Sequence, residues 1–166
     1  MIRPLKNFFY PPTLVYSYNQ PKDIVLVKIN EVLKKKVALL SGNDMKGRFL
    51  NHNTFAIDIV SLAFTGGVQF SSTLIGKVTE SKKGITQIKT KAKPSIAYYV
   101  LFFVTIIAGL AYFYKSIQTG STESLLWPFA AIILGPVMAV GLSNIAIASI
   151  YERYRLHIDK ELNIST

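Results

Sequence analysis

One stretch decides the fold of this chain: SIAYYVLFFVTIIAGLAYFY, residues 95–114. It contains no charged residue, and Lys93 and Lys115 bracket it. A helix of about 20 apolar residues spans the roughly 30 Å of hydrocarbon in a bilayer. Tyrosines lie near both ends of the stretch, as in the aromatic belts at membrane–water interfaces. The pattern predicts a transmembrane helix over residues 95–114.

A second charge-free run extends from Ser124 to Tyr151 and predicts another transmembrane helix over residues 125–150. This run is long enough to cross a bilayer with some tilt. Pro136 lies inside it, where a proline kinks a helix. Residues 115–124 are too few for a domain, so the two spans form a hairpin with a short external loop.

The composition of the whole chain supports this division. Only 17% of the 166 residues are charged, against roughly 25% in a typical soluble domain. There is no Cys, which excludes disulfides, thiolate chemistry and cysteine metal ligands. The composition excludes a wholly soluble protein, a disordered chain and a multidomain enzyme.

The excess positive charge lies before the first span. Residues 1–94 contain 15 Lys and Arg against 5 Asp and Glu, whereas residues 152–166 contain three of each class. Segments rich in Lys and Arg stay on the cytoplasmic side. We therefore expect a multi-pass protein of the cell inner membrane, with residues 1–94, residues 151–166 and both termini in the cytoplasm.

The residues before the first span predict an α+β domain. Prolines and aromatics favour an extended segment over residues 1–20. A helix is expected from Pro21, with Val25, Ile29 and Val32 on one face. A strand over residues 24–29 is the alternative, because that stretch is rich in β-branched side chains.

Alternating side chains then predict strands within residues 36–40, 48–64, 68–78 and 85–91. Short turns separate them, and strands joined by short turns form an antiparallel meander. The expected domain therefore contains one helix and a β-meander.

The segment after the second span, residues 151–166, is expected to continue as an amphipathic helix. Ile150, Tyr154, Ile158 and Leu162 recur every four residues as one apolar stripe, which has to be buried. The predicted fold is an α+β membrane protein: an amino-terminal helix and antiparallel β-meander, a two-helix transmembrane hairpin, and a carboxy-terminal amphipathic helix that packs back on the sheet.

Several short motifs resemble those of small bacterial membrane proteins with two spans. The motifs are Gly47-Arg48-Phe49, Phe55-Ala56-Ile57, Ile75-Gly76-Lys77-Val78 and Gly84-Ile85-Thr86-Gln87-Ile88. In those proteins a helix and a meander precede a two-span hairpin and a short carboxy-terminal helix. The resemblance implies this architecture and implies no activity.

The sequence offers little for catalysis. Its two histidines, His52 and His157, are far apart, and a metal site needs three or four converging ligands. There is no phosphate-binding glycine loop and no nucleophile motif. Asp58 lies between two isoleucines and is expected on the exposed face of a strand. We expect no catalytic residue, no metal, no cofactor and no enzymatic activity.

Small residues on both spans predict close helix packing. Packing within the hairpin is expected, and dimerisation through the same ridge is the alternative. Asn144 is expected to hydrogen-bond across the hairpin, with a ligand or ion role as the alternative. The residues predicted to pack are Thr105, Gly109, Ala131, Gly135, Ala139, Ser143 and Asn144.

The basic residues are expected to rest on anionic lipid headgroups, each contributing about 1 kcal/mol close to the leaflet. Their alternative role is only to set the topology. Nucleic acid is not expected as a partner, because Arg3 and Arg48 are the only arginines before the first span. The residues expected at the membrane surface are Lys34, Lys35, Lys36, Lys82, Lys83, Lys89, Lys91 and Lys93.

Together these features predict a non-enzymatic integral membrane protein. Its basic cytoplasmic domain would bind a protein or a small ligand at the inner membrane surface. A ligand cavity would be lined by Phe55, Ile57, Phe70 and Leu74. The alternative is a self-associating effector that perturbs the bilayer through its small-residue helix ridge, with a second copy of the chain as partner.

Overall fold

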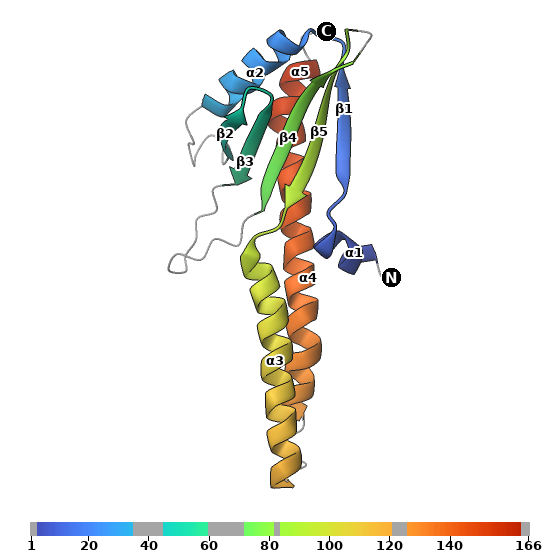
Figure 1. Cartoon of the computed structure of the whole chain (residues 1–166), viewed down its shortest axis with the longest axis vertical. Coiled ribbons are helices and arrows are strands. Elements are labelled where there is room, and N and C mark those ends of the chain that lie inside the picture. Colours follow the sequence, from blue (N-terminus) through green and yellow to red (C-terminus); the bar gives the residue numbers. More distant parts are fainter. Residues whose placement is uncertain (1–2, 35–44, 60–71, 82–83, 121–125, 164–166) are drawn as a thin grey trace.

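A computed structural model describes residues 3–34, 45–59, 72–81, 84–120 and 126–163. Two long helices form a hairpin that projects from a domain of one sheet and several helices (Figure 1). The elements in chain order are α1 (Arg3–Phe9), β1 (Thr13–Tyr18), α2 (Lys22–Lys34), β2 (Met45–Asn51), β3 (Thr54–Ile59), β4 (Thr73–Glu80), β5 (Thr86–Lys93), α3 (Ile96–Thr119), α4 (Leu126–Tyr154), the π-helix η2 (Arg155–Asp159) and α5 (Lys160–Asn163).

The sheet has five antiparallel strands in the order β1-β5-β4-β3-β2. The central part, β3-β4-β5, is the expected meander. Residues 1–20 were expected to form one extended segment, and they differ in containing a helix before the edge strand β1. Instead α1 forms first, with Pro4 in its first turn where its missing N–H costs nothing. The alternating segment after Pro12 then pairs with β5.

Residues 48–64 were expected to form one strand. Instead their described part contains the end of β2 and the whole of β3. Strands β2 and β3 form a hairpin that turns at Asn51–Asn53. The Asn51 side chain accepts a hydrogen bond of 3.0 Å from the Asn53 N–H, the local bond by which Asn stabilises turns. The expected strand over residues 36–40 lies outside the described residues, as do residues 60–64 and 68–71.

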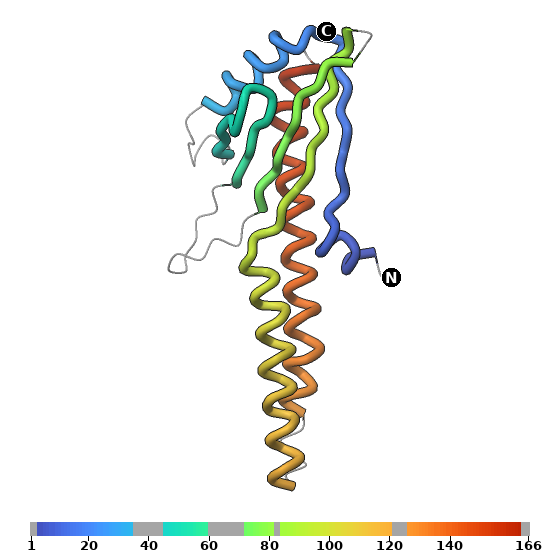
Figure 2. Tube along the Cα trace, in the orientation of Figure 1, coloured from blue at the N-terminus to red at the C-terminus, as the bar shows by residue number. Residues whose placement is uncertain are grey.

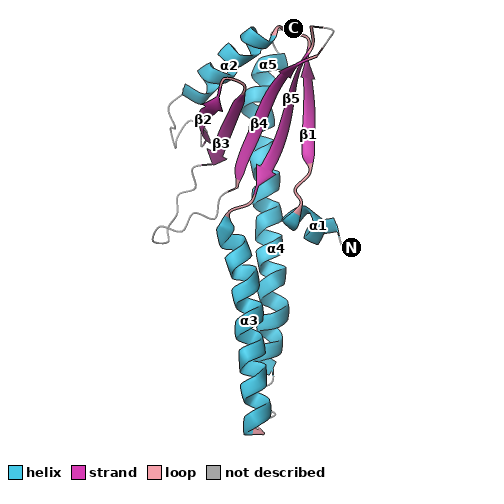
Figure 3. Ribbon diagram, in the orientation of Figure 1, coloured by secondary structure: helices cyan, strands magenta, loops and turns pink. Residues whose placement is uncertain are grey.

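Helix α2 is confirmed over the strand alternative, with Val25, Ile29 and Val32 buried. It covers one face of the sheet together with the end of α4, η2 and α5 (Figure 3). The stripe expected for the carboxy-terminal helix is also confirmed, since Ile150, Tyr154, Ile158 and Leu162 are all fully or nearly fully buried in this core.

A buried glutamine closes the end of the core farthest from the hairpin. The Gln20 side-chain N–H donates to the Leu162 carbonyl at 2.8 Å, and the Thr86 hydroxyl donates to the Gln20 carbonyl at 2.6 Å. These bonds join the segment before α2, strand β5 and helix α5. They satisfy polar groups that would be costly to bury unpaired.

Helix α3 has a defined beginning and end. The Ser95 hydroxyl accepts a hydrogen bond of 3.3 Å from the Ala97 N–H, which is the usual arrangement of an N-cap. At the other end Gly120 has a φ of 66°, a left-handed conformation that favours glycine. The helix therefore extends a full turn beyond Tyr114, where the apolar run ends.

Helices α3 and α4 lie side by side (Figure 2). Both are long and apolar enough to cross a membrane. Only 11% of the most apolar window of α3 is buried, and only 17% of that of the helix from Leu126 to Asn163. A core helix of a soluble protein would be mostly buried, whereas most residues of these two windows are not buried.

Helix α4 passes without interruption from the hairpin into the domain. Ile145 is 68% exposed, whereas Ile147 is 6% exposed and Ile150 is fully buried in the domain core. The last residues of the second apolar run thus pack against the sheet. The part of α4 that faces outward on the hairpin ends near Ile145.

Candidate functional site

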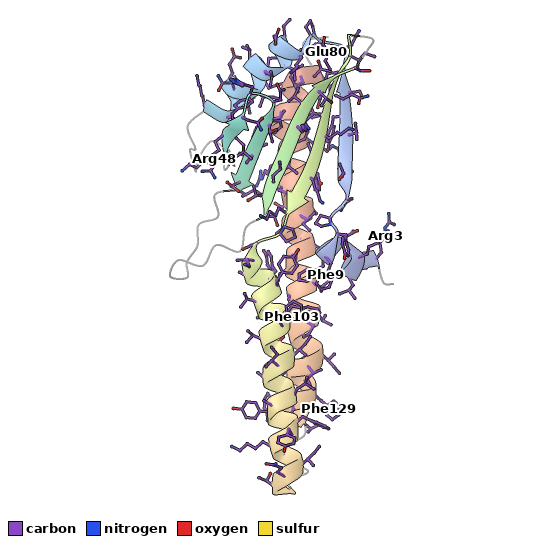
Figure 4. The ribbon with its side chains drawn as sticks, viewed as in Figure 1. Arg3, Phe9, Arg48, Glu80, Phe103 and Phe129 are labelled. Carbon is purple, nitrogen blue, oxygen red and sulfur yellow. The ribbon has the colours of Figure 1, made fainter. Side chains whose placement is uncertain are left out.

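The outer surface of the hairpin is apolar along both helices. Phe103 of α3 and Phe129 of α4, both labelled in Figure 4, are each about half exposed, and the Phe129 ring also packs against the Phe113 ring of α3. Contiguous apolar surfaces of this kind mark sites of contact with proteins or membranes. Large side chains at least half exposed include Val100, Phe103, Val104, Ile107 and Leu110 on α3 and Phe129, Ile133, Leu134, Val137 and Met138 on α4.

The inner surface of the hairpin is built from small residues. A Cβ on Gly135 would collide with the Thr105 side chain, and a Cβ on Gly109 would collide with Ile132. The helices therefore approach closely because these positions carry no side chain. Ala139 and Ser143 are fully buried, and Ala131 is partly exposed. Gly135 of the predicted ridge thus faces α3 of the same chain.

The Asn144 side chain was expected to hydrogen-bond across the hairpin to α3, but its hydrogen bonds go elsewhere. Its side-chain amide donates to the Val140 carbonyl at 2.7 Å and to the Pro4 carbonyl at 3.1 Å. The sequence interpretation had no helix at residues 3–9, so it lacked this acceptor. Asn144 therefore fastens α1 to α4.

Aromatic side chains fasten α1 to α3. Phe8 is fully buried, and its ring centroid lies 4.8 Å from that of Tyr99 and 5.5 Å from that of Phe102. The Tyr99 hydroxyl donates to the Phe8 carbonyl at 3.0 Å. Helix α1 is thereby held against the end of the hairpin nearest the domain (Figure 1).

The sheet face turned away from the helices is basic. Because side chains alternate along a strand, the residues that share this face are every second one. We call the exposed cations on it the basic face: Lys46 and Arg48 from β2, Lys77 from β4, and Lys89, Lys91 and Lys93 from β5.

The strand register places like charges together on the basic face. Lys77 lies directly opposite Lys89, an arrangement that destabilises a sheet. Asp58 is the one acidic side chain on the described part of this face; it lies opposite Lys46 and accepts a hydrogen bond from the Thr73 hydroxyl. The face therefore keeps a strong positive charge that an anionic partner would offset.

The structure places the predicted basic residues in different regions. Lys89, Lys91 and Lys93 are on the basic face, and Lys34 ends α2. Lys35, Lys36, Lys82 and Lys83 lie outside the described residues. The sequence interpretation missed Lys46, Arg48 and Lys77. Lys77 of β4 lies beside Lys89 of β5, whereas Lys46 and Arg48 share the same face two strands farther away, on β2.

The residues proposed to line a cavity lie in the packed core. Phe55, Ile57 and Leu74 are each 0% exposed, and the Phe55 ring covers the position that a Cβ on Gly76 would occupy. Phe70 lies outside the described residues. The three described side chains are in close contact with the core cluster.

A tyrosine cluster joins β1 to the π-helix. The Tyr18 hydroxyl donates to the Asp159 carboxylate at 2.7 Å and lies 3.3 Å from the Tyr154 hydroxyl. The Tyr16 and Tyr154 rings are 4.8 Å apart. Burial, followed by the neighbouring Tyr154 and Asp159, raises the pKa of Tyr18 well above its usual 10.0, and burial likewise raises the pKa of Tyr154.

These phenols therefore stay protonated and serve as hydrogen-bond donors. π-Helical turns often occur at functional sites, and a groove of about 620 Å³ follows the cluster between β1 and η2. It is lined by Tyr16, Tyr151, Arg155 and Asp159, among others. No nucleophile and base converge there among the described residues.

The histidines are not brought together. His52 is exposed at the turn between β2 and β3. His157 lies in η2, where its Nε2 atom is buried without a hydrogen-bond partner in the described structure. Within the described ranges, no three His, Asp or Glu side chains are close enough to hold a metal ion.

Comparisons with known proteins add no relative: no protein-family model matches the chain, no curated protein matches its sequence, and no solved structure matches its fold. The functional argument therefore depends on the apolar hairpin and the basic face.

Proposed function

We propose that this protein is a non-enzymatic, membrane-anchored binding module. The hairpin of α3 and α4 lies in the bilayer, and the domain binds an acidic protein partner through the basic face. The observation that carries the proposal is the large apolar outer surface of the hairpin, which no element of the described chain covers.

The dimensions of the hairpin suit a bilayer. Helix α3 has 24 residues, and at 1.5 Å per residue it is about 36 Å long. The outward-facing part of α4 begins at Leu126 and ends near Ile145. Twenty residues cover the roughly 30 Å of hydrocarbon.

The charge distribution supports one orientation of the hairpin. The lysine-rich strand β5 leads directly into α3, and cations beside a span stay in the cytoplasm. In this orientation the domain and both ends of the chain are cytoplasmic, and the hairpin lies in the cell inner membrane.

The geometry favours a protein partner over the bilayer itself for most of the basic face. Strands β4 and β5 run lengthwise along the direction of the hairpin (Figure 1). The sheet therefore stands steeply on the membrane, and only its Lys93 end lies close to the headgroups. Lys77 and Lys89, farther along the strands, are presented to the cytoplasm.

The chemistry of the basic face also favours protein over nucleic acid. Five of its six cations are lysines, and its described part carries no aromatic ring on which a base would stack. An acidic, extended protein segment fits this surface.

Two experiments test the proposal. Alkaline carbonate should leave the chain in the vesicles, and its release would contradict the anchor. A photocrosslinking amino acid at Ile75, on the basic face, should capture a protein in native membranes, and the K77E/K89E double variant should lose that adduct.

Val27, exposed on α2, is the matched control position. A crosslinker there should not capture the same protein. Equal capture at Val27, or capture that survives K77E/K89E, would contradict the basic face as the binding surface.

A further inference from the structure

An apolar crevice lies where α1 crosses the hairpin. It has a volume of about 520 Å³, within the roughly 300–1,000 Å³ of small-ligand sites. Its walls contain almost no polar surface. They are formed by Pro4 and Leu5 of α1, Phe102 of α3, and Pro136, Val140 and Gly141 of α4.

Gly141 is an open position in the crevice wall. A Cβ added to it would meet no atom within 4 Å, whereas a Cβ on Gly135 would collide with Thr105. The two glycines of α4 therefore differ: Gly135 permits helix contact, and Gly141 leaves the helix surface open. A Cβ at residue 141 would therefore stand in open space beside the crevice.

The wall formed by α1 is held in place by polar and aromatic contacts. Asn144 donates to the Pro4 carbonyl at 3.1 Å, and Tyr99 donates to the Phe8 carbonyl at 3.0 Å. These contacts fix α1 as one wall of the crevice.

Cations accompany the apolar walls. Arg3 and Lys6 flank Pro4 and Leu5 on α1, and both are exposed. Figure 4 shows Arg3 directed away from the hairpin. The site thus combines an apolar crevice with positive charge at its α1 side, which is the chemistry of a phospholipid with an anionic headgroup.

We propose that the crevice binds one acyl chain of an anionic phospholipid of the surrounding bilayer, with Arg3 and Lys6 pairing with its headgroup. This inference rests on the proposed membrane insertion. It assigns a specific lipid site to α1, which the anchoring of the hairpin alone does not require.

The test uses the full chain in phosphatidylcholine vesicles that contain a trace of phosphatidylglycerol with a photoreactive acyl chain. Adducts should concentrate on Phe102 and residues 136–141. G141L should lower labelling there several-fold, because its side chain would occupy space that the acyl chain needs and would remove van der Waals contacts with the crevice walls. A111L, which places a leucine at an exposed position of α3, should leave the labelling unchanged.

A comparison of two lipids tests whether Arg3 and Lys6 pair with the headgroup. Photoreactive phosphatidylcholine should label the crevice several times less than phosphatidylglycerol, and R3Q/K6Q should abolish that preference. Equal labelling by both lipids in the unaltered chain would overturn the role of Arg3 and Lys6.

The outcomes separate the two proposals. Adducts spread evenly over the outer surface, Phe103 and Ile107 included, and unaffected by G141L would overturn the lipid site and leave the anchor intact. A hairpin without any adduct would overturn both.

Discussion

The hairpin and the domain use similar apolar residues in opposite arrangements. In the domain, large side chains such as Phe55 and Ile57 are fully buried and the outer sheet face is polar. In the hairpin, large side chains such as Phe103 face outward and small ones such as Gly135 face inward. This difference is the one that the proposed insertion requires, with water around the domain and lipid around the hairpin.

Helix α4 shows this change of arrangement within one element. Ile145 faces outward on the hairpin, whereas Ile150, little more than one turn later, is fully buried against the sheet. An unbroken helix therefore belongs to both regions. Matched substitutions in the domain and in the hairpin test whether the two regions bury their side chains in these opposite ways.

The largest difference is expected for phenylalanine truncations. F55A should lower the free energy of unfolding of the domain by about 4 kcal/mol, because it leaves a cavity in a packed core. F103A, on the outer hairpin surface, should leave domain unfolding unchanged. Urea denaturation in mild detergent, followed by circular dichroism, measures both, and equal losses would contradict the comparison.

The next largest difference in stability is expected between substitutions at two glycines of α4. G135L should destabilise the hairpin by about 2 kcal/mol, because overpacking forces the helices apart at Thr105. G141L should cost much less, since its side chain enters open space. Titration with a denaturing detergent compares them, and a G141L loss as large as that of G135L would show that Gly141 is also a packing position.

The tyrosine cluster predicts alkaline sensitivity of the domain alone. Folding raises the pKa of Tyr18 above 10.0, so above pH 10 the unfolded chain loses a proton that the folded domain keeps. The stability of the domain therefore falls as pH rises beyond this value. Y18F should reduce that slope, and at neutral pH should cost about 1.5 kcal/mol through the lost bond to Asp159.

The hairpin provides the control for this pH effect. Y112F, at an exposed position of α3, should leave the slope unchanged. Domain unfolding measured from pH 8 to pH 12 reports it. A slope identical in Y18F and in the unaltered chain would remove Tyr18 as its source.

The smallest effect is expected on the basic face. K89E replaces a repulsion with Lys77 by an attraction, and should stabilise the domain by about 0.5 kcal/mol at low salt. K91E, opposite Ile75, lacks this direct pair and should stabilise less. Thermal unfolding at two salt concentrations separates the variants, and an unchanged or lower melting temperature for K89E would contradict the register argument.

Long periodic segments were predictable from the sequence. The two apolar runs, helix α2 and the stripe from Ile150 to Leu162 each repeat one pattern over several turns. Such patterns depend only on which side chains avoid water. That is why the α+β class and the packing of the last helix against the sheet agreed with the structure.

Short elements, and elements held by contacts with distant parts of the chain, were not predictable in the same way. Helix α1 is too short to show a periodic pattern, and it is held by Asn144, far along the chain. Strand β1 depends on pairing with β5, which no local signal reveals. The basic face likewise required the register that brings Lys77 beside Lys89.

The sharing of α4 between the two regions sets an order for biosynthesis. All five strands leave the ribosome before α4, and the stripe that completes their core is made last of all. The nascent sheet therefore waits, with its apolar face uncovered, until the second helix of the hairpin has been made. Under the proposed membrane insertion, maturation of the domain is in this way coupled to delivery of the hairpin to the bilayer.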